Sequence, residues 1–255
     1  MGFLPGQSFH YQDPTLPGDL FDVKIKLRDE TSRLMKDAKA SYHHGNLRAA
    51  LLAAGEKVLA VTGVARFSLR EVARLSGVSH AAPAHHFKNA NGLLTALAID
   101  GFRRFLAAMQ RRQETVGDDP VARILASGLG YVDFARANPA LFRLMFGDER
   151  IAHDDPELTA VADAAFIHLA ADVGKFMGAS PFTHPPAMAR TLAIWNLVHG
   201  YVQLMNAGYM KAVQNLPEVG RDAYLIELLG LLLRPPAART PKSLAKSLVM
   251  GRPPR

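Results

Sequence analysis

The segment FSLREVARLSGVSHAAPAHHF, residues 67–87, decides how the chain folds. Ser68 is the expected N-cap of the first helix in this segment. Glu71 follows three residues later, where a capping box has an acidic residue. Gly77 ends this helix after about two turns, because glycine permits the left-handed backbone of a tight turn. Ser79 then caps a second short helix that runs to the final His-Phe pair. Two short helices joined by such a turn are typical of a helix-turn-helix.

Helical periodicity continues on both sides of this segment. Upstream, apolar residues recur at helical spacing over 46–62, and downstream a long helix is expected over 91–115. Further amphipathic helices are expected over 187–212 and 217–233. The sequence therefore predicts an all-α fold, in which an N-terminal three-helix unit is joined by a long helix to a larger helical domain.

Composition divides the chain into four predicted segments. A flexible extension over 1–40 precedes a helix-turn-helix domain over 41–90, a helical domain over 91–234 and a basic, disordered tail over 235–255. The 41–90 segment holds six Lys and Arg against two Asp and Glu, whereas 91–234 holds 13 against 15. A compact basic segment beside a larger, slightly acidic one fits a DNA-binding module attached to a sensing module.

Several classes of function are excluded or disfavoured by composition. The chain contains no cysteine, which excludes disulfides, thiolate zinc sites, iron–sulfur clusters and cysteine nucleophiles. The pairs His43-His44 and His85-His86 do not predict a metal site, because adjacent side chains on a helix diverge. We expect no cofactor, no membrane span and a cytoplasmic location. An enzyme is disfavoured because the polar residues do not form a paired acid and base.

Three stretches of the sequence resemble a known family. Residues 42–104, from YHHGN to GFRR, resemble the N-terminal domain of TetR-type transcriptional regulators. The stretches NPALFRLMFG and IWNLVHGYVQLM resemble the C-terminal domain of the subgroup named after its Trp-His-Gly motif, here Trp195, His199 and Gly200. Together they cover roughly residues 41–234. The resemblance implies a repressor that binds a palindromic operator in double-stranded DNA as a homodimer and is released by a small, mainly apolar effector.

The resemblance also implies which residues contact DNA. A short helix in the major groove needs small or polar side chains where it approaches the bases, and the second helix of the motif has them. The N-terminus of the first helix offers N–H groups to phosphate. The expected DNA-binding residues are Ser68, Arg70, Ser79, His80, Ala81, Ala82, His85 and Lys88.

Two departures from the family pattern leave an alternative open. Ala84 stands where the family usually has a tyrosine that contacts phosphate, and Ala90 and Asn91 stand where it usually has a lysine. Either the affinity for DNA depends more on the basic tails, or DNA binding is weakened or altered. The alternative function is therefore a ligand-binding or scaffold homologue that has lost operator binding.

The larger domain is rich in aromatic residues and methionine. Such residues most often form helical core, but the resemblance implies that some of them line an apolar effector cavity. The expected ligand-binding residues are Phe102, Phe105, Met109, Tyr131, Phe134, Phe142, Met145, Phe166, Trp195 and His199. The last two predicted helices carry more apolar surface than one subunit needs. Their expected dimer contacts are Ala193, Leu197, Gly200, Leu204, Leu225, Leu228, Leu229 and Leu232.

Overall fold

Helices make up the described fold. The computed structural model describes residues 47–147 and 150–234, and these ranges contain helices and no strand, which confirms the predicted all-α class. The predicted extension and tail lie outside the described residues. The helices are α2 (Leu47–Thr62), α3 (Leu69–Ser76), α4 (Ala81–Phe87), α5 (Ala90–Gln113), α6 (Pro120–Ala137), α7 (Pro139–Gly147), α8 (Pro156–Met177), α9 (Pro185–Asn206), α10 (Lys211–Gln214) and α11 (Glu218–Leu233).

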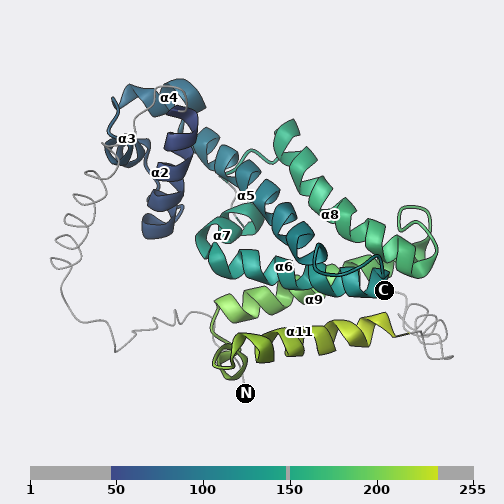
Figure 1. Ribbon diagram of the computed structural model, residues 1–255. Coiled ribbons are helices and arrows are strands. Elements are labelled where there is room, and N and C mark those ends of the chain that lie inside the picture. Colours follow the sequence, from purple (N-terminus) through teal and green to yellow (C-terminus); the bar gives the residue numbers. More distant parts are fainter. Residues whose placement is uncertain (1–46, 148–149, 235–255) are drawn as a thin grey trace, which may run out of the picture.

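Three helices, α2, α3 and α4, form a compact unit at one end of the molecule (Figure 1). Their apolar side chains, which include Leu51, Val72 and Phe87, meet in a small core together with Phe67 from the connection before α3. Gly77 at the end of α3 has a φ of 66°, so the turn predicted there is confirmed. This core fixes α4 against α3 and leaves the outer surface of both helices to solvent.

The long helix α5 connects the three-helix unit to the larger domain (Figure 1). It has 24 residues and begins one residue earlier, and ends two residues earlier, than the pattern predicted. Its first half packs on α2, where Leu93 and Leu97 lie against Gly55. Its second half contributes Phe105 and Met109 to the core of the larger domain. One helix therefore belongs to both units.

Two arginines tie the three-helix unit to the larger domain. Arg104 of α5 pairs with Glu56 of α2, with 2.6 Å between nitrogen and oxygen, and also donates a hydrogen bond to Asn138 between α6 and α7. Arg150 donates a hydrogen bond to the backbone carbonyl of Val64, in the loop after α2. These contacts join segments far apart in sequence and hold the small unit in one orientation.

The larger domain is built around a very close crossing of α5 and α6. A Cβ atom added to Gly130 of α6 would lie 2.5 Å from the carbonyl oxygen of Ala108 in α5. Glycine is therefore required for the two backbones to approach. Helix α8 packs on α5 and α6, and α9 packs on α6 and α8, which closes the core.

A buried polar cluster lies where α5, α6 and α8 meet. Arg123 donates to Asp172 at 3.0 Å, and Gln113 donates to the other oxygen of the same carboxylate at 2.6 Å. Arg123 also donates to the Gln113 side-chain oxygen at 2.8 Å. Since the Asp172 side chain is only 3% exposed, its charge is balanced inside the protein rather than by water.

Helices α9 and α11 lie side by side at one edge of the molecule (Figure 1). The predicted helix over 187–212 is divided, because α9 ends at Asn206 and α10 follows separately. Leu225 and Leu229 are buried within their own chain, so the prediction that they contact a second subunit is wrong. Leu204 is 49% exposed, and Leu231, which was not predicted, is 57% exposed. None of the described helices has the length and hydrophobicity that a transmembrane segment needs.

Candidate functional site

The start of α3 has the local structure that a helix N-terminus needs to meet an anion. Ser68 is the N-cap, and its hydroxyl accepts a hydrogen bond from the backbone N–H of Arg70 at 3.3 Å. The side chain of Arg70 is exposed. The second half of the predicted capping box is wrong, because the Glu71 carboxylate binds Arg74 one turn later, at 2.9 Å. The N-terminus of α3 therefore depends on serine alone for its side-chain cap.

Helix α4 begins at Ala81, one residue later than predicted. No side-chain hydrogen bond caps it, so the prediction that the Ser79 hydroxyl does so is wrong. Ser79 contributes its carbonyl instead, which accepts from the N–H of Ala82 at 3.1 Å. His80 already has helical dihedral angles and needs no separate cap. The turn between α3 and α4 is thus closed by the backbone.

Most of the predicted DNA-binding residues lie on the outside of the three-helix unit. Ser68 and Ala82 are half-buried, and the exposed ones are Arg70, Ser79, His80, Ala81, His85 and Lys88. On the opposite side of α4, Pro83 and Phe87 are buried. His86, which lies next to the buried Phe87, is also exposed. The exposed face of α4 therefore carries small and polar side chains, whereas its buried face is apolar.

The corner between α4 and α5 contains two residues that the sequence reasoning missed. Asn89 caps α5, and its side-chain oxygen accepts from the N–H of Gly92 at 2.9 Å. A Cβ atom added to Gly92 would lie 2.0 Å from the carbonyl oxygen of Phe87, the last residue of α4. Lys88 between the helices has a φ of 65°, which is unusual for a residue with a side chain. An asparagine three residues before a glycine was the signal available in the sequence.

The predicted ligand-binding residues separate into two groups in the larger domain. Met109, Tyr131 and Trp195 line a cavity between α5, α6, α8 and α9 with a volume of about 20 Å³. Phe166 packs on Trp195, with 5.3 Å between ring centroids. The remaining apolar members are buried core residues that do not line this cavity: Phe102, Phe105, Phe134, Phe142 and Met145. A volume of this size holds about one water molecule, so the cavity is closed to a larger ligand.

His199 connects the aromatic core to the surface. Its Nδ1 lies 2.7 Å from the hydroxyl of Tyr131, and its Nε2 lies 3.1 Å from the side-chain amide nitrogen of Gln203. Burial lowers the pKa of His199 and raises the pKa of Tyr131, because both charged forms lose hydration. Both groups are therefore neutral near pH 7, and the arrangement is a hydrogen-bonded chain rather than an ion pair.

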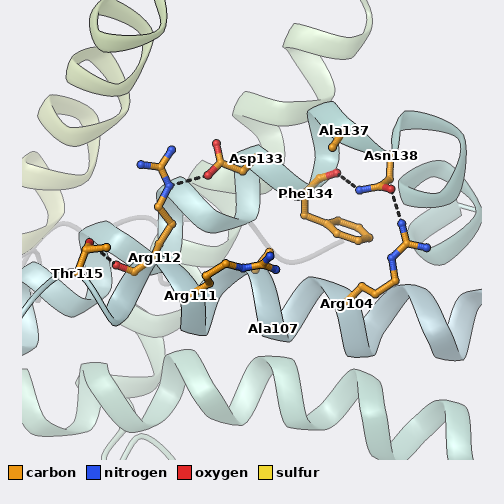
Figure 2. A pocket seen from close by; sticks show the side chains of 10 residues that line it. Arg104, Ala107, Arg111, Arg112, Thr115, Asp133, Phe134, Ala137 and Asn138 are labelled. Carbon is orange, nitrogen blue, oxygen red and sulfur yellow. Dashed lines mark hydrogen bonds and ion pairs between the residues drawn. The ribbon is translucent and has the colours of Figure 1, made fainter.

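A larger hollow, missed by the sequence reasoning, lies on the surface between α5 and α6 (Figure 2). Its volume is about 680 Å³. We call it the α5–α6 groove and define it by Arg104, Ala107, Ala108, Arg111, Arg112, Thr115, Asp133, Phe134, Ala137 and Asn138. It is separate from the cavity that Trp195 lines, because the two share no lining residue.

These features define a helical protein with an N-terminal helix-turn-helix and a larger C-terminal domain. Residues 124–224 match the model of the "Tetracyclin repressor-like, C-terminal domain" family. The chain belongs to the TetR family of transcriptional regulators. The finer assignment to a Trp-His-Gly subgroup stays a prediction.

Solved structures share this fold. A protein of unknown function from a Rhodococcus species is 33% identical, with a TM-score of 0.65, and the match covers 76% of this chain and 96% of that one. The TetR family transcriptional regulator PfmR from Thermus thermophilus is 17% identical, with a TM-score of 0.55 over 76% of this chain and 99% of that one. The superantigen PfiT is 16% identical, with a TM-score of 0.57 over 75% and 96% of the two chains. No curated protein matches the sequence at a significant level.

Proposed function

We propose that this protein is a repressor that binds a palindromic operator as a homodimer through the helix-turn-helix domain of residues 41–90. The observation that carries the proposal is the surface of α4, where small and polar residues are exposed over a buried apolar base. A recognition helix must approach base edges closely, and alanine and histidine side chains permit that approach. In this proposal α4 enters the major groove.

The start of α3 would then contact the DNA backbone. The N-terminus of a helix carries partial positive charge and free N–H groups, which favour phosphate binding. Arg70 is exposed beside the Ser68 cap and adds a full positive charge there. We assign Arg70 to a base or phosphate contact, and Ser68, His85 and Lys88 to supporting contacts.

Dimerisation is proposed through α9 and α11. A twofold interface brings the same surface of each subunit together, and a protein surface with exposed leucines gains stability when it is covered. Leu204 and Leu231 are about half exposed on these two helices. A palindromic operator requires the two copies of α4 in such a dimer to reach successive major grooves.

The first prediction is that operator binding will be dimeric and steeply dependent on salt. Each phosphate neutralised contributes about −0.9 to the slope of log affinity against log salt, and two subunits contact several phosphates. Gel-shift titrations with the upstream region of its own gene, at several salt concentrations, measure the slope. Arg70→Ala should weaken binding by about 1–3 kcal/mol, whereas Arg136→Ala, an exposed arginine on α6, should not. A slope near zero, or one protomer per site, would rule the proposal out.

The second prediction concerns the effector, which we place in the cavity lined by Met109, Tyr131 and Trp195. Drug-sized ligands need roughly 300–1,000 Å³, so an apolar effector has to open this cavity and thereby shift α5. A hundredfold loss of operator affinity corresponds to about 2.7 kcal/mol of coupling, and operator DNA must weaken effector binding equally. Compounds that change the fluorescence of Trp195 should be titrated into free protein and into the operator complex. Equal affinity in both titrations contradicts the mechanism.

The alternative function, a ligand-binding homologue without operator binding, is favoured by two departures from the family pattern. Ala84 is exposed on α4 where the family pattern has a phosphate-contacting tyrosine, and the first residues of α5 are Ala90 and Asn91 rather than a cation. The absence of any salt-sensitive gel shift, together with effector binding at the Trp195 cavity, would favour this alternative.

A further inference from the structure

The α5–α6 groove is hollow because small side chains line much of it. Ala107 of α5 and Ala137 of α6 form its apolar wall together with the ring of Phe134 (Figure 2). Ala108 of α5 also lines the groove. The groove follows α5 from Arg104 to Arg112, a distance of about 12 Å at 1.5 Å per residue, and Thr115 lines it just after the helix ends. Its volume of about 680 Å³ lies within the range of small-molecule sites.

Two of the three arginines in the groove are already bound to acidic residues. At one end, Arg104 contacts Glu56 at 2.6 Å and Asp100 at 3.3 Å. At the other end, Arg112 donates to Asp133 at 2.6 Å. Asp222 and Glu218 of α11 lie 3.6 and 3.9 Å from Arg112. Neither arginine therefore carries an uncompensated charge.

Arg111 differs from these two arginines. It lies between them in the groove, and its side chain makes no hydrogen bond or ion pair within the part of the chain that the structure describes (Figure 2). Its side chain is exposed, so its charge is hydrated rather than buried. A guanidinium presents two parallel N–H groups that match the two oxygens of a carboxylate, and it also stacks on planar groups. The groove thus offers the guanidinium of Arg111 as an anion-binding group beside an apolar wall.

The surrounding acidic residues limit how much negative charge a ligand can carry. Burial raises the pKa of Asp222, and the nearby carboxylates Asp133 and Glu218 raise it further, against the opposing effect of Arg112. More anionic charge at this end of the groove would increase that repulsion. A nucleic acid backbone or another polyanion is therefore disfavoured, whereas a single carboxylate at Arg111 meets one free positive charge.

We propose that the α5–α6 groove binds an organic monocarboxylate with an elongated apolar body. The carboxylate accepts two hydrogen bonds from Arg111, and the apolar body covers Ala107, Ala108 and Ala137. This site is distinct from the effector cavity at Trp195, and its occupation does not require operator binding.

The test uses the full chain without DNA and decanoate as the probe, with decanamide as its neutral counterpart. Isothermal titration calorimetry should detect decanoate binding, and decanamide should bind at least tenfold more weakly. Arg111→Gln should weaken decanoate binding at least tenfold, because it removes the charged fork from a site where the side chain has no structural partner. Arg111→Lys should fall between, because it keeps the charge and loses the paired donors.

Two further variants separate this site from other sites. Ala107→Leu fills the groove without changing its charge and should also weaken decanoate binding at least tenfold. Arg143→Gln, an exposed arginine of α7 outside the groove, should leave binding unchanged. The proposal is overturned if decanoate does not bind, or if it binds the wild-type protein and Arg111→Gln equally. Because no DNA is present, neither result bears on the proposed operator binding.

Discussion

Replacing Asp172 with alanine is expected to lower the free energy of unfolding by about 3–5 kcal/mol. The carboxylate is almost fully buried and is the partner of both Arg123 and the Gln113 side chain. Its removal leaves a guanidinium partly buried without its acid and an amide N–H without its strongest acceptor. An unpaired charge in such a place costs more than the lost pair itself contributed.

Urea unfolding followed by circular dichroism measures this difference. Asp163→Ala on the same helix is the matched control, because Asp163 is exposed, and its effect should stay within about 0.5 kcal/mol. If both variants unfold at the same urea concentration, the Asp172 cluster does not stabilise the fold.

Replacing Gly92 with alanine is expected to reduce operator affinity about a hundredfold, which corresponds to about 2.7 kcal/mol. The added methyl group would lie 2.0 Å from the Phe87 carbonyl oxygen, so α4 and α5 must separate at their shared corner. A backbone oxygen cannot rotate away as a side chain can. The recognition surface of α4 therefore moves relative to α5.

Gel-shift titration measures the loss of affinity, and this experiment depends on the proposed function. A second measurement does not: the variant should also lose about 1–3 kcal/mol of stability from the steric conflict. Gly147→Ala is the control, because nothing lies within 4 Å of the added Cβ atom there. Normal stability and normal operator affinity of Gly92→Ala together would show that the corner tolerates the methyl group.

Local signals in the sequence predicted the helix-turn-helix well. Ser68 and Gly77 each act through their own backbone neighbours, so their roles follow from residue type and position. The errors occurred where several partners compete. Glu71 had two partners within reach and binds Arg74 rather than the helix N-terminus. Ser79 was expected to use its hydroxyl, but the backbone carbonyl takes that place.

Features that depend on tertiary packing could not be predicted from the sequence. The apolar pattern of α11 marks Leu225 and Leu229 as residues to be covered, but it does not distinguish their own chain from a second subunit. The α5–α6 groove depends on how two helices cross, and no local pattern around Arg111 records that crossing. The predicted ligand-binding residues that line the cavity and those that form core are all large aromatic residues or methionine, apart from His199, so apolar character alone did not separate them.

The contact between Ala108 and Gly130 gives α5 the mechanics of a lever. Because the two backbones touch at Ala108, α5 has its fulcrum near its C-terminal end, away from α4. From Ala108 to Ala90 the arm is about 27 Å long at 1.5 Å per residue. A rotation of about 5° at the fulcrum moves the tip, and α4 with it, by about 2.4 Å. In the proposed dimer, the same rotation in both subunits would change the distance between the two α4 helices by up to about 4.8 Å, twice the displacement of one helix.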